Sequence, residues 1–226
     1  MANRAYLRVW TRDFSLETMI AEFARFLASV PLSESHAGFD QLTVQAVDAT
    51  ETPVVEWDMR EQNYGAAEVA ALAAQQLYPD VAYIVNAKWD LWAFDIETLK
   101  WQHGPQPLVL LCQGKDFDGG SADSDGQLSA DLGFEHLFTG HGGMLVPGTT
   151  SDPFVEGDHP IERTFRSWMA SGENLKEYHQ KTRENIQKLF AWVEAVEHAL
   201  PVLRSELWSE GEENFEARLD AILDQR

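Results

Sequence analysis

The sequence has few cations, and this shortage excludes two classes of partner. Its 226 residues contain 17 Lys and Arg against 37 Asp and Glu, which gives a formal net charge of −20. Binding to a nucleic-acid backbone requires cations that neutralise phosphates, and anionic membranes repel a chain of this charge. No compact group of Lys and Arg offsets the total. We therefore expect neither nucleic acid nor a membrane as a direct partner.

Cysteine and long apolar runs are also scarce. The single cysteine, Cys112, cannot form an intrachain disulfide, so the fold does not depend on an oxidised framework. The longest apolar run covers only residues 69–74, whereas a membrane-spanning helix needs about 20 residues. Arg4, Arg8 and Arg12 interrupt the first residues, which leaves no apolar core for a signal peptide. These features predict a cytoplasmic protein.

Hydrophobic residues make up 44% of the chain, which is typical of a folded domain and too high for a disordered acidic tail. Periodicity in the first part predicts an α+β fold. The expected elements follow the order strand, helix, strand, strand, helix, strand, and cover residues 4–11, 15–30, 41–47, 53–58, 63–77 and 81–87.

That order is found in ferredoxin-like sandwiches, in which helices cover one face of an antiparallel sheet. We therefore predict a ferredoxin-like βαββαβ core within residues 1–92. Its open face would be mixed polar and aromatic, with side chains such as Tyr6, Arg8 and Trp10.

The chain continues with further strand-like segments, so residues 1–136 are expected to form one sheet domain with extra strands. A loop is expected over 137–160. Residues 161–226 are predicted to form a helical extension that packs on the same domain, with a long helix that opens at Asn174 and a last helix after Ser209. The sequence is compatible with a monomer or a small homo-oligomer.

A 47-residue stretch, 116–162, contains ten Asp and Glu and no Lys or Arg. Four of its aspartates share one glycine-rich loop, and the spacing fails the EF-hand calcium pattern. The registers that begin at Asp116 and Ser121 place Gln127 and Leu132, not Glu, at the twelfth position. We interpret the loop as a solvated surface that binds a basic protein. The candidate binding residues in it are Asp116, Asp118, Asp123 and Asp125.

Tryptophan could supply aromatic anchors for such a surface. Trp89, Trp92 and Trp101 lie close together in a presumed hairpin, and we expect Trp89 and Trp101 to be the exposed pair. Core packing is the alternative, because most tryptophans are largely buried.

A second hypothesis is a divalent metal site. Asp131, Glu135, His136 and His141 lie within eleven residues, and carboxylate and imidazole groups are ligands for zinc or manganese. The spacing matches no recognised zinc motif.

Two functions therefore compete. The first is a non-catalytic, inhibitor- or immunity-like module without a cofactor, whose acidic surface binds a basic protein. The alternative is a metal-dependent hydrolase built on residues 131–141. Motifs for a serine nucleophile elbow or a phosphate-binding loop are absent from the sequence, which favours the first.

Overall fold

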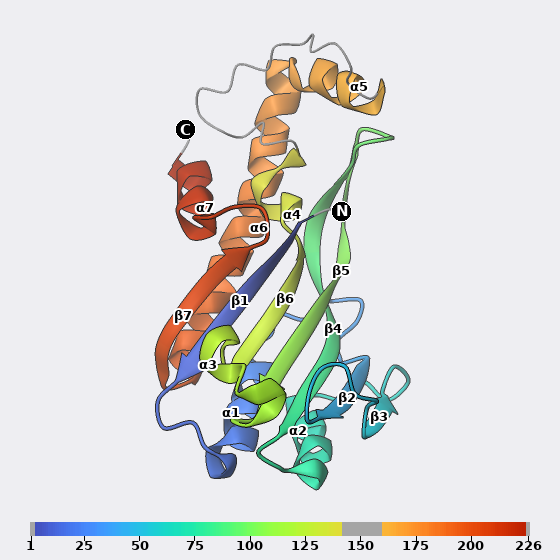
Figure 1. The fold of residues 1–226 in the computed structure, drawn as a ribbon. Coiled ribbons are helices and arrows are strands. Elements are labelled where there is room, and N and C mark those ends of the chain that lie inside the picture. The colour runs from blue at the N-terminus through green and yellow to red at the C-terminus, as the bar shows by residue number, and fades with distance from the viewer. Residues whose placement is uncertain (1–2, 142–159, 225–226) are drawn as a thin grey trace.

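The computed structural model (Figure 1) describes residues 3–141 and 160–224. Its strands form one antiparallel sheet in the order β3-β2-β4-β5-β6-β1-β7. The predicted α+β class is confirmed. The strands are β1 (Arg4–Thr11), β2 (Gln41–Ala46), β3 (Val55–Asp58), β4 (Val81–Asp95), β5 (Lys100–Gln113), β6 (Leu128–Phe134) and β7 (Val202–Ser209).

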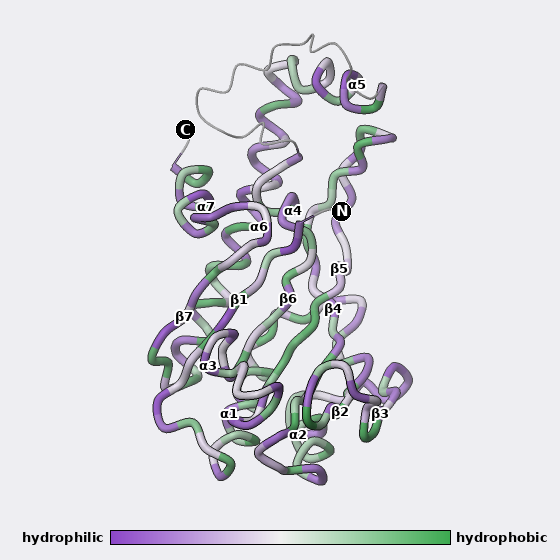
Figure 2. Tube along the Cα trace, viewed as in Figure 1, coloured by the Kyte–Doolittle hydropathy of each residue, from purple (hydrophilic) through white to green (hydrophobic). Residues whose placement is uncertain are grey.

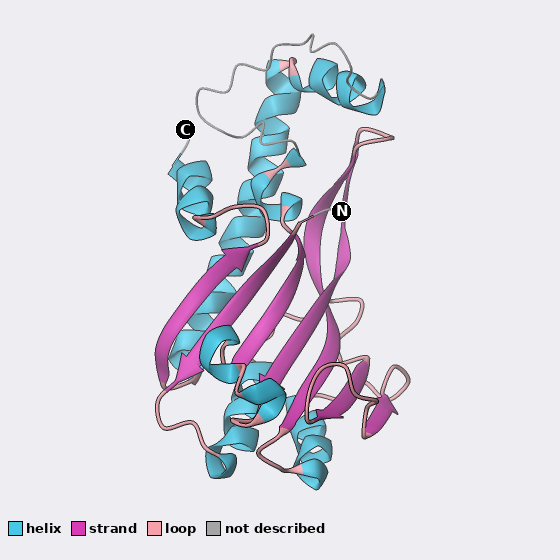
Figure 3. Cartoon of the chain, viewed as in Figure 1, coloured by secondary structure: helices cyan, strands magenta, loops and turns pink. Residues whose placement is uncertain are grey.

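Helices cover mainly one face of this sheet, as Figure 3 shows. The long helix α6 crosses behind the strands, and α1 and α2 lie behind their lower ends, while the short α3 lies on the opposite face (Figure 1). The helices are α1 (Leu16–Ala28), α2 (Ala66–Ala73), η1 (Ala74–Gln76), η2 (Phe117–Gly119), α3 (Ala122–Asp125), α4 (His136–Thr139), α5 (Pro160–Met169), α6 (Gly172–Ala199) and α7 (Phe215–Asp224).

The core lies between the sheet and the helices α1, α2 and α6. Apolar and polar residues alternate along α6, as Figure 2 shows, so one stripe of the helix faces the sheet. On that stripe Trp192 stacks on Phe26 of α1 at 6.1 Å between ring centroids and meets Trp89 of β4 edge-on at 5.7 Å. These contacts fix α6 against both the sheet and α1.

The structure corrects the predicted ferredoxin-like strand pairing. In a split βαβ unit one strand separates the two parallel strands. Here β4, β5 and β6 all lie between β1 and β2, and β1 pairs with β6 and β7 instead. Only the second unit, β3-α2-β4, has a single strand between its two parallel strands, because β2 lies between β3 and β4. The long β4–β5 hairpin and β6 fill the place that a ferredoxin-like sheet gives to one strand.

The strand predicted at 81–87 is longer than expected. It continues to Asp95 as β4, and the strand-like residues that follow include a second long strand, β5. β5 includes two prolines, Pro105 and Pro107. Both lie where β5 pairs only with β4, because β6 joins it from Val109 onward. Proline is tolerated at such an edge, where its missing N–H leaves no ladder bond unmade.

The expectation of a purely helical segment after residue 161 is also corrected. After α6 the chain forms β7, which pairs with β1 along its length. β7 therefore ties the C-terminal part into the sheet. Of the loop expected over 137–160, α4 covers the first residues and 142–159 lie outside the described residues. Within the described part of the chain, no helix is long and apolar enough to cross a membrane.

Candidate functional site

Three loops meet at one end of the sheet and bring carboxylates together. The backbone N–H of Val47, after β2, donates to the Asp80 carbonyl at 2.8 Å, and the N–H of Asp118 donates to the Val47 carbonyl at 2.8 Å. The N–H of Asp116 donates to the Pro79 carbonyl at 2.8 Å. Figure 1 shows η2 and α3 at this end with the β2–β3 loop. We call this surface, residues 46–51, 78–80 and 115–125, the acidic end.

The acidic end is ordered by burial and by an unusual backbone. Phe117 and Ala122 anchor the loop in the core. Val47 has φ of 70° and Asp118 has φ of 47°, in the left-handed region that a β-branched residue rarely adopts. Gly114 is required because a Cβ there would collide with the carbonyl oxygen of Pro79. The loops hold a fixed shape as a result.

Three aspartates of this end are exposed and uncompensated. Asp116, Asp118 and Asp123 form no ion pair among the described residues, and all three are exposed. The neighbouring Asp48 accepts hydrogen bonds from the Thr50 hydroxyl and N–H, which lower the pKa of its carboxyl. Asp48 is therefore ionised at neutral pH.

Two other acidic residues of the stretch are neutralised by arginines from β1. Asp125 lies 3.4 Å from the guanidinium of Arg8, and Asp131 lies 2.6 Å from Arg4. Asp125 was predicted as a binding residue, and its charge is compensated in the structure. Fewer carboxylates of this surface therefore lack a neighbouring cation than the sequence suggests.

The acidic end also contains two exposed apolar residues that the sequence analysis missed. Val47 is 56% exposed and Tyr78 is 57% exposed. Val47 continues the apolar alternation of β2 and Tyr78 follows an apolar helix, so both resemble core positions in the sequence. The only sequence signal was the turn composition after Val47 and the proline after Tyr78.

The four predicted metal ligands do not converge. Asp131 binds Arg4, and Glu135 accepts hydrogen bonds from the Ser209 hydroxyl at 2.7 Å and the Gly211 N–H at 3.2 Å. The rings of His136 and His141 do meet, with centroids 4.2 Å apart. Among residues 3–141 and 160–224 no group of three or more His, Cys, Asp or Glu could hold a metal.

The histidine pair is half-buried and neutral. Burial lowers the pKa of His136, and burial together with the neighbouring His136 lowers the pKa of His141 to about 4. The Nδ1 of His141 lies 2.7 Å from the Tyr178 hydroxyl, and that hydroxyl also accepts the His141 N–H at 2.9 Å. The pair belongs to an aromatic cluster between α6, α5 and the β4–β5 hairpin, which includes Phe94.

The expectation that Trp89 and Trp101 are the exposed pair is wrong for Trp89. Its side chain is 0% exposed, because it faces the helices and packs on Phe138 and Trp192. Trp101 is half-buried and packs on Phe94 and Tyr178 at 5.0 Å between centroids. Which of the two tryptophans is buried depends on where α6 packs against the sheet, and the sequence alone does not show that position. Trp89 has no surface with which to anchor a partner.

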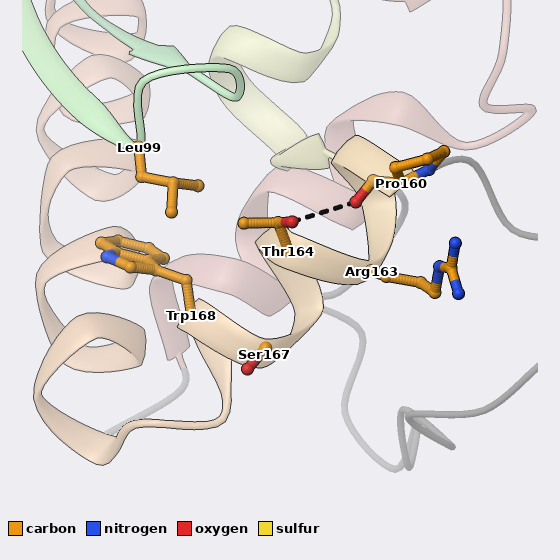
Figure 4. A pocket seen from close by; sticks show the side chains of 6 residues that line it. All are labelled: Leu99, Pro160, Arg163, Thr164, Ser167 and Trp168. Atoms are coloured by element: carbon orange, nitrogen blue, oxygen red, sulfur yellow. Dashed lines mark hydrogen bonds between the residues drawn. The ribbon is translucent and has the colours of Figure 1, made fainter.

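A cavity of about 600 Å³ lies between α5 and the turn of the β4–β5 hairpin (Figure 4). Leu99 and Trp168 face each other across it, while Arg163 points away from them. The Thr164 hydroxyl donates within its own helix to the Pro160 carbonyl at 3.0 Å. Binding pockets usually combine apolar walls with a few convergent polar groups. The described lining residues of this cavity lack that convergence.

No family model, no curated protein and no solved structure matches this chain.

Proposed function

We propose that this protein is a non-catalytic interaction module that binds a basic protein at the acidic end, as an inhibitor or an immunity-like protein does. The observation that carries the proposal is that Asp116, Asp118 and Asp123 are exposed, lack ion-pair partners among the described residues and lie on an ordered loop. Fixed, solvated carboxylates are suited to bind a cationic surface, since little conformational freedom is lost on association.

Charge and apolar anchors would have separate roles. The net charge of −20 accelerates encounter with a cationic partner, and the effect weakens as salt shortens the screening length to a few Å. Val47 and Tyr78 would supply the apolar contact at the centre, since exposed apolar side chains ringed by polar groups are common in interfaces. The proposed partner is a soluble basic protein, met in the cytoplasm.

The test compares two triple variants with the same net charge. Asp116→Asn, Asp118→Asn and Asp123→Asn remove the proposed carboxylates. Glu61→Gln, Glu97→Gln and Glu213→Gln remove three exposed carboxylates elsewhere. Both variants and the wild type are immobilised and exposed to lysate of the source cells. We expect the wild type and the second variant to capture the same basic protein, and about 0.5 M salt to release it.

The proposal is contradicted if both triple variants lose capture equally, because the binding would then follow total charge. It is also contradicted if no basic protein is captured by the wild type.

One observation favours the alternative, a metal-dependent hydrolase. His136 and His141 adjoin each other, as two ligands of one ion would. Catalytic zinc sites need three protein ligands, and the predicted Asp131 and Glu135 have other partners. Elemental analysis of the purified protein decides between the two: stoichiometric zinc or manganese would replace the binding proposal.

A further inference from the structure

The sheet has two edges, and only one of them is long. The edge strand β3 has four residues and exposes Glu56 and Asp58. The other edge strand, β7, has eight residues and, within residues 3–141 and 160–224, pairs with β1 alone. Short, charged edges resist the addition of a further strand, whereas a long unpaired edge is a template for one. The edge of β7 is therefore the better template.

The outer side of β7 is open along its middle. Figure 1 shows β7 as the last strand of the sheet, with α6 behind it and α7 beyond its upper end. Among the described residues, no hydrogen bond reaches the backbone of residues 203–207 from the outer side. Arg204 and Glu206 pair with each other at 2.8 Å on the open face of the sheet, where Arg204 lies over Trp10. They do not cap the outer backbone.

A groove of about 260 Å³ lies under this edge, between α6 and α7. Its apolar floor includes Phe190 and Val193 of α6 and Leu207 of β7. Small-molecule pockets usually have roughly 300–1,000 Å³. A groove of this size, beside an unpaired strand, is suited to side chains of an added strand rather than to a whole ligand. Leu203, 67% exposed at the start of β7, extends the apolar surface.

The rim of the groove is acidic. Glu194, Glu216 and Asp220 are exposed and form no ion pair among the described residues. Glu197 accepts a hydrogen bond from the Ser205 hydroxyl at 2.7 Å, which places another carboxylate beside β7. No Lys or Arg is among the described lining residues of the groove. The rim therefore favours a cationic occupant.

We propose that β7 and this groove bind an extended basic segment of a partner protein, which adds to the sheet as one further strand. Its backbone completes the β7 ladder, its apolar side chains enter the groove and its Lys or Arg side chains pair with the rim. A second copy of this chain is the weaker candidate, because it would bring the same acidic rim and a net charge of −20 to the contact. The surface differs from the acidic end and does not depend on it.

The test uses the full chain and a short extended peptide that carries both Val and Lys on one face and Thr on the other, because alternate side chains of a strand point to opposite faces. We expect amide hydrogen exchange to slow in residues 203–208 when the peptide is added. The triple variant Glu194→Gln, Glu216→Gln and Asp220→Asn should weaken binding about tenfold or more. The matched variant Glu61→Gln, Glu97→Gln and Glu213→Gln, and the variant of Asp116, Asp118 and Asp123, should bind as the wild type does.

A peptide N-methylated on the edge that faces β7 should fail to bind, since it cannot complete the ladder. Equal weakening in all three triple variants, unchanged exchange in β7, no binding, or equal binding of the N-methylated peptide would overturn the proposal. So would a wild-type dimer in sedimentation velocity whose residues 203–208 are already protected from amide exchange without the peptide. Loss of binding only in the variant of Asp116, Asp118 and Asp123 would support the acidic end and refute this site.

Discussion

Val47 combines a left-handed backbone with a side chain that is 56% exposed. A left-handed conformation costs an L-residue about 1–2 kcal/mol, and a β-branched side chain is especially disfavoured there. The two hydrogen bonds of Val47 to Asp80 and Asp118 hold this conformation. Backbone strain is often found at binding sites, where the position of a side chain matters more than the stability of its backbone. The strain at the exposed Val47 is therefore consistent with a residue that contacts a partner.

Val47→Asn should therefore stabilise the protein. Asparagine tolerates the left-handed region, and little burial is lost, so we expect the free energy of unfolding to rise by about 1 kcal/mol in urea denaturation. Val54→Asn is the control, because Val54 is 54% exposed and is not among the residues with positive φ. It should change the stability by less than about 0.5 kcal/mol. A Val47→Asn variant that is no more stable than the wild type would show that the backbone stores no strain.

His141 should make the protein sensitive to mild acid. Its pKa is about 4 in the folded state, below the ordinary 6.5, because partial burial and then the neighbouring His136 disfavour its charged form. The unfolded state therefore binds the proton first as the pH falls below 6.5, and the folded state loses stability until about pH 4. Between pH 7 and pH 5 the loss from this group is about 2 kcal/mol.

Urea denaturation at several pH values measures this loss. His141→Asn keeps a polar side chain near Tyr178 but has no imidazole to protonate. The variant should lose about 2 kcal/mol less than the wild type between pH 7 and pH 5. Parallel curves for the two proteins would mean that His141 does not carry the acid sensitivity.

At the scale of elements, α6 holds the molecule together. Trp192 contacts both α1 and β4, and Asn185 donates to the carbonyls of Trp92 and Leu137 at 2.8 Å each. The helix therefore joins the sheet to the helical layer along most of its length.

Trp192→Ala should be strongly destabilising. Truncation of a buried tryptophan leaves a cavity and costs about 3–5 kcal/mol. Trp168→Ala on α5 is the comparison, because Trp168 is only half-buried, and we expect a clearly smaller cost. Equal losses measured by chemical denaturation would contradict the central role of α6.

Local patterns predicted most elements but not their pairing. The alternation of Ala5, Leu7 and Val9 identified β1 and its buried face, which are as predicted. The partner of β1 was wrong, because strand pairing depends on contacts between distant segments. β7 was missed because the polar residues Arg204, Ser205 and Glu206 interrupt its apolar pattern.

At the scale of the whole molecule, charge is distributed unevenly. The arginines of β1 neutralise Asp125 and Asp131, but no described cation reaches Asp116, Asp118 or Asp123. The exposure of the acidic loop was predictable from its lack of cations. The pairing of Asp125 and Asp131 with arginines was not predictable, because these arginines lie near the start of the sequence and approach the aspartates only when the sheet forms.

The affinity for the captured basic protein tests the central claim most directly. It is measured by titration calorimetry for the wild type, for the variant of Asp116, Asp118 and Asp123, and for the matched variant of Glu61, Glu97 and Glu213. Coupling energies of charge pairs at interfaces begin at about 1.5 kcal/mol, and about 1.4 kcal/mol is a tenfold change in Kd. We predict that only the aspartate variant binds at least about tenfold more weakly. Equal Kd values for the two variants would contradict the claim that these three carboxylates form the binding surface.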